Sequence, residues 1–417
     1  MPSKASPKPL KFLSKVRLRE VWDEAKKKSS SAFNAAGVDG MRGSTFAKNL
    51  DKNISHLAAE IARGEFHFSN LHPVWIPKRG SKNKERLICI PTVRDRLVQR
   101  VLVKTLSTKN RLKLSSEVSF GFQEGLGVKR AIEKACSLRQ TNTWVVKTDV
   151  CSFFDRIDRK SMMDKFVASA PKSFISLIPL ITQIVNCEVK AKPGSDLKKL
   201  QANGIVVGKG LRQGMPISPL LSNLELREFD RNAVTAGYKM IRYADDIAVF
   251  CSGESEAKAA LKNCEQWLKE LGHEIPKLDD GGKTKIFNPN ESVEFLGFDL
   301  VLDQAKGLYL AKIPKSSFDK IFEQIRNSST LAYCETEKWN FAEFVKNLNS
   351  KKSAYRGAYS YAVNYDEFIS KLESNSRNAT RELLKELFGS EALKKLSDKK
   401  LNFLGIDGTF NDEDANC

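Results

Sequence analysis

Residues 240–251 read M-I-R-Y-A-D-D-I-A-V-F-C, an apolar run interrupted by two adjacent acids. Apolar residues flank the pair Asp245-Asp246, so the pattern predicts two short strands joined by a tight turn that carries both acids. A second apolar run, W-V-V-K-T-D-V at 144–150, predicts another strand with Asp149 at its end. We therefore expect three carboxylates at the tips of buried strands.

Carboxylates that crowd together in a poorly solvated site repel one another strongly. Divalent cations remove that cost, and Mg²⁺ prefers carboxylate and phosphate oxygens. Two such ions, roughly 4 Å apart, activate a 3′-hydroxyl and stabilise a pyrophosphate leaving group. A single acid at a strand end is an ordinary surface residue, so it is the combination of three that indicates nucleotidyl transfer.

The rest of the chain alternates predicted strands and helices, as an α+β enzyme core does. Apolar spacings of three and four predict a helix over 44–63 that stops at Gly64. Ser218 is expected to be a helix N-cap, with Pro219 at the first helical position. Strands are expected at 74–77 and 86–91, and helices at 92–108, 127–139, 218–235 and 255–271, with mostly helix beyond about residue 300.

The 417 residues include 69 Lys and Arg against 50 Asp and Glu, a formal net charge of +19. This charge indicates a polyanionic partner, with nucleic acid as the first candidate, although a basic protein that is merely soluble is the alternative. The hydrophobic content of 41% excludes global disorder. Residues 1–30 hold nine Lys and Arg, which fit either an arm that contacts nucleic acid or a solvated tail that runs into a helix.

None of the eight cysteines forms a C-x-x-C pair, and there are four histidines, which argues against a zinc site. A disulfide framework is not expected in a chain of this length, so we expect a cytoplasmic protein. The basic start, residues 1–15, has no apolar stretch behind it and does not read as a signal peptide. The longest apolar-leaning run, residues 174–185, is too short to span a bilayer, so no membrane partner is expected.

Four segments, in order and in spacing, resemble motifs of reverse transcriptases. Y-A-D-D at 243–246 resembles the Y-x-D-D signature, and D-V-C-S-F-F-D at 149–155 resembles the first palm motif. R-Q-G-M-P-I-S-P at 212–219 resembles the Q-G-x-P-x-S-P segment, and F-L-G at 295–297 resembles a later element. Four independent motifs in register make this resemblance highly specific.

The group II intron type is the most similar kind of reverse transcriptase. G-V-D-G at 37–40 matches the start of those enzymes, and V-W-I-P-K at 74–78 with R-L-I-C-I-P-T-V-R-D-R at 86–96 matches their finger motif. Y-R-G-A-Y at 355–359 resembles a segment of their thumb. The resemblance therefore runs from residue 37 to about residue 365.

This resemblance implies a fold and a division of the chain. The fold class is α+β, a right-hand polymerase fold with fingers, a palm built on an antiparallel sheet, and a helical thumb. We expect a basic N-terminal extension over 1–36, interleaved fingers and palm (the reverse transcriptase domain) over 37–300, and a helical thumb with a C-terminal tail over 301–417.

The resemblance also implies a metal site. Asp149 and Asp245 are the expected metal ligands, the carbonyl of Val150 assists them, and Asp246 is the third carboxylate. The expected cofactor is a pair of Mg²⁺ ions, with Mn²⁺ as a substitute.

A nucleotide site is implied in the same way. Lys78 and Arg86 are expected to hold the triphosphate as charged donors, and Gln213 is expected to contact the incoming nucleotide. Phe153 and Phe154 are placed at the same site, where Phe154 would abut the sugar and exclude a 2′-hydroxyl. The alternative to a nucleotide site is a solvated basic hairpin for Lys78 and Arg86, a polar loop residue for Gln213, and a core aromatic for Phe154.

Two segments depart from the family pattern. Lys283, in G-G-K-T-K at 281–285, resembles the lysine of an E-K-T-K element and is the candidate acid for pyrophosphate, but D-D-G-G at 279–282 replaces the usual N-P-E before it. G-F-Q-E-G at 121–125 lacks the arginine of the family's G-F-R-P-G, so the charge for a template contact is missing there.

We therefore expect an RNA-directed DNA polymerase that uses dNTPs, an RNA template and a DNA product. A maturase-like RNA-binding protein that has kept the fold is the alternative, although the intact carboxylates favour the enzyme. The sequence lacks the N-A-x-x-H and V-T-G elements of retron enzymes, and it ends without a DNA-binding or H-N-H nuclease region. We therefore expect a compact host-encoded enzyme that copies a dedicated structured non-coding RNA in antiviral defence, with a mobile-element enzyme as the alternative.

Overall fold

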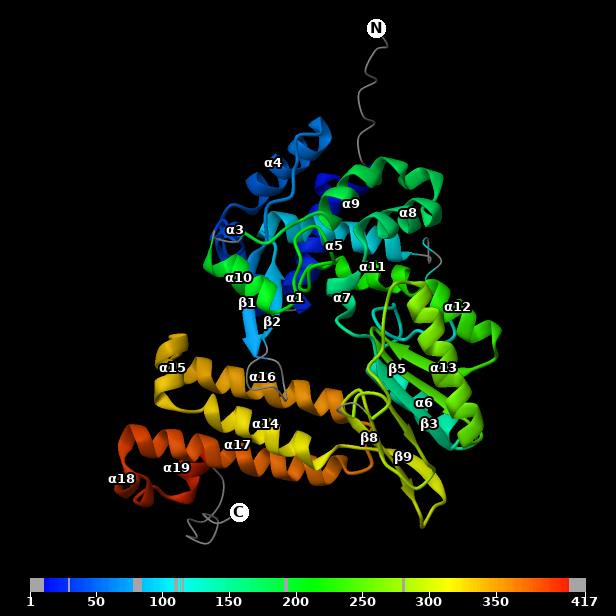
Figure 1. Ribbon diagram of the computed structural model, residues 1–417. Coiled ribbons are helices and arrows are strands. Elements are labelled where there is room, and N and C mark those ends of the chain that lie inside the picture. Colours follow the sequence, from blue (N-terminus) through cyan, green and yellow to red (C-terminus); the bar gives the residue numbers. More distant parts are fainter. Residues whose placement is uncertain are drawn as a thin grey trace. The chain divides into compact units, whose positions relative to one another are not determined.

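The computed structural model folds as two compact units (Figure 1), one of Met1–Gly127 with Val146–Ile286 and one of Val128–Val145 with Phe287–Cys417. The structure describes residues 11–28, 31–77, 85–108, 116–190, 194–279 and 282–404, with Leu112 and Leu114. Lys78 of the expected nucleotide site lies outside the described residues. The expected domain boundaries at 36/37 and 300/301 stay predictions.

Helices make up most of the first unit. They are η1 (Lys11–Leu13), α1 (Lys15–Lys28), α2 (Ser31–Asn34), α3 (Gly43–Lys48), α4 (Leu50–Arg63), α5 (Val93–Ser107), α7 (Phe153–Arg156), α8 (Arg159–Ser169), η3 (Lys172–Leu177), α9 (Ile178–Val185), α10 (Ser195–Ala202), α11 (Ser218–Glu225), α12 (Arg227–Thr235) and α13 (Glu254–Glu270). The strands are β1 (His72–Pro77), β2 (Glu85–Ile90), β3 (Trp144–Asp149), β4 (Lys239–Tyr243), β5 (Asp246–Cys251) and β6 (Lys285–Phe287).

The sheet of the first unit brings the acid-bearing strands together. Its order is β4-β5-β3-β6, so the strand that ends in Asp149 lies directly beside β5. β4 and β5 form an antiparallel hairpin in which Tyr243 pairs with Asp246. The strands predicted at 144–150 and 240–251 are confirmed, and so is the tight turn between the last two.

One helix covers this sheet through an apolar stripe. The buried residues of α13 are Ala257, Ala260, Cys264 and Leu268. They recur at intervals of three and four, which puts them on one face of the helix. The helix lies against β5 (Figure 1), so the helix predicted at 255–271 is confirmed and supports the strand that begins at Asp246.

Two predicted helices are each divided in the structure. The helix predicted over 44–63 breaks at Asn49, whose φ and ψ of −124° and 42° are not helical. Asparagine has a low helix propensity, which makes a boundary there inexpensive, and its side chain makes no capping hydrogen bond. The helix predicted over 218–235 breaks at Leu226, between α11 and α12.

The predicted N-cap of α11 is wrong by one residue. Ile217 occupies the N-cap position, so Ser218 is the first helical residue and Pro219 the second. The hydroxyl of Ser218 donates instead to the carbonyl of Arg212, at 2.9 Å. The Ser218 side chain therefore stabilises the loop before α11 and does not cap the first turn of the helix.

The second unit joins a three-stranded sheet to a group of helices. Its elements are α6 (Val128–Arg139), β7 (Val293–Phe295), β8 (Phe298–Asp303), β9 (Leu308–Lys312), α14 (Lys315–Asn327), α15 (Leu331–Glu337), α16 (Phe341–Tyr359), α17 (Tyr365–Phe388), α18 (Ser390–Lys394) and α19 (Asp398–Phe403). The antiparallel order β7-β8-β9 means that the expected helical region begins only at Lys315. Among the described residues, no helix has the length and hydrophobicity needed to cross a membrane.

The basic N-terminal segment contributes to the core of the first unit. Leu18 and Trp22 of α1 are buried, at 0% and 2% exposure. The Trp22 ring lies 4.5 Å from that of Phe33 and 5.0 Å from that of Phe46, measured between centroids. Residues 15–28 are thus an integral helix and not a free arm.

We expect Trp22→Ala to lower the free energy of unfolding by about 3–5 kcal/mol, because it removes a buried indole and leaves a cavity between two aromatic rings. Val16→Ala is the matched control, since Val16 lies on the same helix but is 68% exposed. Urea denaturation of both variants measures the difference. Equal effects of the two substitutions would show that α1 does not support the core.

Candidate active site

Two of the catalytic candidates, Asp245 and Asp246, lie at a strained hairpin turn. Ala244, between Tyr243 and Asp245, has a φ of 57°, in the left-handed region, and is 8% exposed. A residue with a Cβ adopts this conformation only at a cost, so the surrounding structure must hold it in place.

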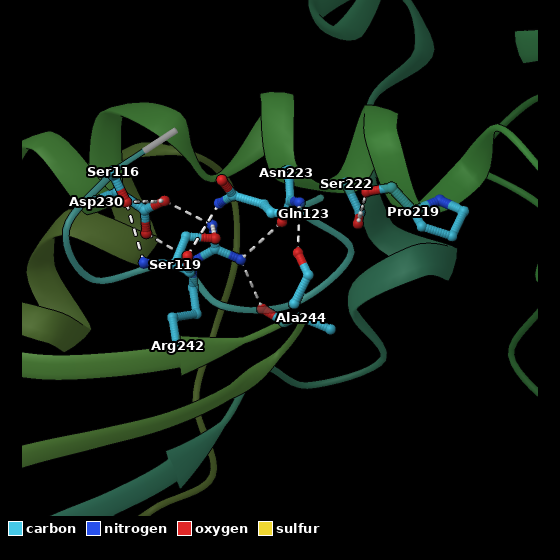
Figure 2. Close-up of polar contacts among 10 residues, drawn as sticks. Ser116, Ser119, Gln123, Pro219, Ser222, Asn223, Asp230, Arg242 and Ala244 are labelled. Atoms are coloured by element: carbon cyan, nitrogen blue, oxygen red, sulfur yellow. Dashed lines mark hydrogen bonds and ion pairs between the residues drawn. The ribbon is translucent and has the colours of Figure 1, made fainter. Parts of the chain in front are cut away.

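A buried arginine two residues earlier in the chain provides that support. Arg242 is 0% exposed, and its Nη1 donates to the carbonyl of Ala244, at 2.9 Å, and to Oδ1 of Asn223, at 3.1 Å (Figure 2). Its Nε and Nη2 bind both oxygens of Asp230, at 2.6 and 2.5 Å. Nη2 also donates to the hydroxyl of Ser119, at 2.8 Å. We call these five residues the Arg242 cluster.

The segment 116–123 lies against the same turn. The amide of Phe120 donates to the carbonyl of Arg242, at 2.8 Å. A Cβ added to Gly121 would lie 2.7 Å from the amide nitrogen of Ala244. Because no larger residue fits there, Gly121 permits close backbone contact with the turn that carries Asp245.

The position at which the family's arginine is missing has a clear structural role. Gln123 directs its Nε2 toward the carbonyl of Ser119, at 3.0 Å (Figure 2). Asn223 donates to the carbonyl of Gly121, at 2.8 Å. Gln123 therefore stabilises its own loop and presents no charge to a template, as expected from the missing arginine in G-F-Q-E-G.

The three acids influence one another's ionisation. Burial raises the pKa of Asp245, and the charge of Asp149 raises it further. Burial raises the pKa of Asp246 to about 6, and its neighbour Asp245 adds to the shift. Lys283 and Arg86 oppose these shifts at Asp245. The site thus concentrates negative charge in a poorly solvated place, as the sequence led us to expect.

Asp149 has one oxygen that no protein group satisfies. Its Oδ2 accepts from Nζ of Lys283, at 2.7 Å, whereas its Oδ1 is buried without a hydrogen-bond partner. An unsatisfied buried carboxylate oxygen is costly, and a divalent cation would remove that cost. The residues present therefore fit a metal ion.

Within the described ranges, no group of three or more His, Cys, Asp or Glu side chains forms a complete metal-binding cluster. Mg²⁺ in polymerase-type sites is usually held by one or two carboxylates together with substrate phosphates and water. An arrangement that is open on the substrate side is thus compatible with such ions.

The expected sugar gate and its neighbour differ in exposure. Phe153 is 2% exposed, and its ring packs 5.1 Å from that of His273. Phe154 is half-buried, with its ring 5.4 Å from that of Phe153. Phe153 therefore supports Phe154 from the core, and the surface available to a nucleotide belongs to Phe154.

Backbone contacts tie Gln213 to the segments that carry Phe154 and Arg86. The amide of Leu211 donates to the carbonyl of Phe154, at 2.8 Å, and the carbonyl of Gln213 accepts from the amide of Cys89 on β2, at 2.7 Å. Gly214, with a φ of 102°, allows this approach, since a Cβ there would lie 2.5 Å from the Cys89 carbonyl.

Sequence reasoning missed several supporting residues. The only signal for Arg242 was a charge inside the apolar run M-I-R-Y, and nothing marked Asp230 or Asn223 as its partners. Lys147 was also missed, although its positive charge lowers the pKa of Asp246. Alternation along β3 puts Lys147 on the same strand face as Asp149.

The chain matches the family model described as reverse transcriptase (RNA-dependent DNA polymerase) over residues 76–300, which is more than half of its length. That range includes Arg86, Asp149, Gln213 and the Y-A-D-D turn.

Curated relatives resemble the chain at low identity. Protein YkfC of Escherichia coli K12 is 26% identical over 67% of this chain and 79% of its own length. The group II intron-encoded protein LtrA of Lactococcus lactis is 23% identical over 60% of this chain, and that match spans 38% of LtrA. The type-1 retrotransposable element R2 polyprotein of Nasonia vitripennis is 25% identical over 62% of the chain and 27% of the polyprotein.

Solved structures show partial likeness. A partial Cas6-RT-Cas1–Cas2 complex matches with a TM-score of 0.33 and 23% identity, over 62% of this chain and 41% of that one. Apo telomerase from Candida tropicalis matches with a TM-score of 0.42 and 13% identity, over 63% and 59% of the two chains.

We expect Asp246→Asn to raise the free energy of unfolding at pH 7, without divalent cations, by on the order of 2 kcal/mol. The pKa of about 6 in the folded protein exceeds the ordinary 3.8, so ionisation of Asp246 disfavours folding. This penalty is fully present above pH 6, declines as the pH falls and vanishes below about pH 4.

Urea denaturation of Asp246→Asn at pH 7 and pH 4 tests this prediction. Asp319→Asn, at an exposed position, is the control. A gain of the same size at both pH values would contradict the electrostatic explanation.

Asp230→Ala should lower the free energy of unfolding by about 3–5 kcal/mol, because it leaves Arg242 buried without its carboxylate. The double variant Arg242→Met with Asp230→Leu should recover much of that loss, since apolar replacements of a buried ion pair are tolerated. The double variant should still bind Mn²⁺ several-fold more weakly than the wild type, because the hydrogen bond from Arg242 to the Ala244 carbonyl is then lost.

Denaturation and Mn²⁺ titration by electron paramagnetic resonance separate the two effects. Arg139→Met is the control, since Arg139 is equally buried but bonds to carbonyls of the second unit. Mn²⁺ affinity at the wild-type level in the double variant would show that the turn does not depend on the Arg242 cluster.

Proposed function

This chain belongs to the reverse transcriptase family and is an RNA-directed DNA polymerase of the bacterial, group II intron-like type, and from that premise we propose how its residues perform the reaction. The proposed reaction is nucleotidyl transfer, in which a primer 3′-hydroxyl attacks a dNTP with two Mg²⁺ ions as cofactors. The observation that carries it is the grouping of Asp149, Asp245 and Asp246 at the ends of adjacent strands, with Oδ1 of Asp149 unsatisfied.

In this proposal, Asp149, Asp245 and the carbonyl of Val150 hold the ions, and Asp246 is the third carboxylate. Bound Mg²⁺, or Mn²⁺ in its place, would lower the pKa of the primer hydroxyl and neutralise the leaving pyrophosphate. The raised pKa values of Asp245 and Asp246 support this role, since a cation relieves the charge repulsion that produces them.

Lys283 is the proposed acid for pyrophosphate. Its hydrogen bond to Asp149 raises its pKa, so the ammonium group keeps its proton at neutral pH. Its side chain is 62% exposed, which leaves it free to turn toward a leaving group. A metal ion on Asp149 would compete with the ammonium for the same carboxylate and favour that movement.

The proposed nucleotide site combines Arg86, Phe154 and Gln213, and Lys78 belongs to it by resemblance. Arg86 acts on the triphosphate, and its influence on the ionisation of Asp245 supports a position close to the acids. Phe154 excludes a 2′-hydroxyl from the incoming sugar; the bond from Leu211 to its carbonyl holds its backbone, and the Phe153 ring packs 5.4 Å from its own.

Asp245→Asn and Asp149→Asn should each reduce dNTP incorporation on a primed RNA template by at least about a thousandfold, because each removes a charge that holds the reacting metal. Extension assays over a range of Mg²⁺ and Mn²⁺ concentrations provide the measurement. Asp319→Asn, with the same chemical change at an exposed site, should polymerise normally. Undiminished synthesis by Asp245→Asn would refute the assignment.

We further propose that the template is a dedicated, structured non-coding RNA and that its copying serves antiviral defence. The net charge of +19 supports strong binding to any nucleic acid, but contacts to phosphates carry no sequence information. Selectivity must then come from RNA shape. An intron-type maturase or a mobile-element enzyme is the alternative, and the intact acids favour catalysis over pure RNA binding.

One small RNA should dominate the nucleic acid that co-purifies with the protein, and cells should contain a DNA copy of part of it that disappears in Asp245→Asn. Sequencing the bound RNA, and comparing total DNA between wild-type and variant cells, tests both statements. A broad mixture of transcripts without such a DNA copy would contradict the dedicated template and leave the polymerase assignment intact.

A further inference from the structure

Phe122 combines two unusual features. Its side chain is 52% exposed, and its φ of 58° lies in the left-handed region, which bulky residues rarely adopt. Backbone strain of this kind persists only where the surrounding structure maintains it, and it gathers at sites that bind or react. An aromatic ring in solvent adds little to the packing of the first unit, so its exposure indicates contact with a ligand.

The backbone on either side of Phe122 is firmly held. The carbonyl of Gly121 accepts from Asn223, at 2.8 Å, and the Nε2 of Gln123 donates to the carbonyl of Ser119, at 3.0 Å (Figure 2). Asn223 and Ser119 belong to the Arg242 cluster. The exposed ring is therefore displayed by a rigid support and not by a loose loop.

This support is the same one that holds the catalytic turn. A Cβ on Gly121 would meet the backbone of Ala244, so two Cα steps of about 3.8 Å each and one van der Waals contact of about 3.5 Å place Phe122 within about 11 Å of Asp245 along the backbone. The Phe122 ring also lies 6.0 Å from the ring of Tyr243, between centroids. Phe122 thus extends an aromatic surface that begins next to the acids.

The activity of the chain determines which ligand reaches this place. A polymerase brings the 3′ end of a primer, paired to its template, to the catalytic carboxylates. Successive bases along a strand are spaced by about 3.4 Å, so a position about 11 Å away corresponds to the first three or so base steps behind the primer end. Aromatic side chains stack on bases without sequence preference, because every base presents a π face.

We propose that Phe122 contacts a nucleobase of the primer–template duplex within about three base steps of the primer end, with its ring against the base or the base edge. This inference rests on the proposed placement of the reaction at Asp149, Asp245 and Asp246. It assigns to the G-F-Q-E-G segment an apolar contact with the duplex, in place of the charged one that its sequence lacks.

Binding of an RNA template annealed to a DNA primer, measured in EDTA, tests the contact without catalysis. Phe122→Ala should weaken binding by about tenfold, the usual effect of losing one base-stacking side chain. The slope of log affinity against log salt should stay unchanged, because the ring neutralises no phosphate. Phe122→Trp should bind as tightly as the wild type.

Fluorescence of 2-aminopurine locates the contacted base. The probe is placed at each of the first five positions from the primer end, in the template or in the primer. A quenching change within the first three positions that disappears in Phe122→Ala is expected, and the responding strand identifies the source of the base. Ile175→Ala is the control, because Ile175 is 59% exposed but lies on η3.

Three outcomes would overturn the proposal: wild-type affinity in Phe122→Ala, a changed salt slope, or full rescue by Phe122→Leu. Rescue by leucine would mean that the residue merely packs beside Tyr243. Asp245→Asn separates this inference from the proposed function. If Asp245→Asn cannot polymerise while Phe122→Ala binds like the wild type, only the base contact fails.

Discussion

The structure of the candidate active site depends on one buried ion pair. Arg242 and Asp230 are both almost fully buried, and each loses its hydration, a cost that good geometry and further hydrogen bonds must offset. The guanidinium meets this condition by using all three of its nitrogens, on the Asp230 carboxylate, Asn223, Ser119 and the carbonyl of Ala244. A lysine has no planar fork and could not bind these partners in one plane.

Two strained residues are joined through that interaction. Ala244 and Phe122 both have positive φ, and both lie next to backbone held by the Arg242 cluster. Strain in a turn is tolerable when several hydrogen bonds determine its conformation together. A single support therefore fixes the position of the acids and the display of an exposed aromatic ring, so catalysis and contact with the duplex are mechanically linked in our proposal.

The acids themselves oppose folding. Burial and mutual repulsion raise the pKa values of Asp245 and Asp246, which means that their ionised forms are penalised in the folded protein. Lys283, Arg86 and Lys147 offset part of this repulsion, and the unsatisfied oxygen of Asp149 leaves room for a cation. In a site of this kind, the crowded acids lower the local stability of the fold and at the same time favour the binding of metal ions, as is common at functional sites.

The sequence by itself determined strands at 144–150 and 240–251 and the position of the acids at their ends, because alternating and continuous apolar runs are local signals. It could not reveal that Asp230 and Asn223 meet Arg242, nor that Phe153 is buried while its neighbour is half exposed. The break at Asn49 and the shifted start of α11 at Ser218 were not apparent from the sequence either. Tertiary structure alone settled the partners of Arg242 and the burial of Phe153, because a hydrogen bond between residues 119 and 242 leaves no periodic pattern in either segment.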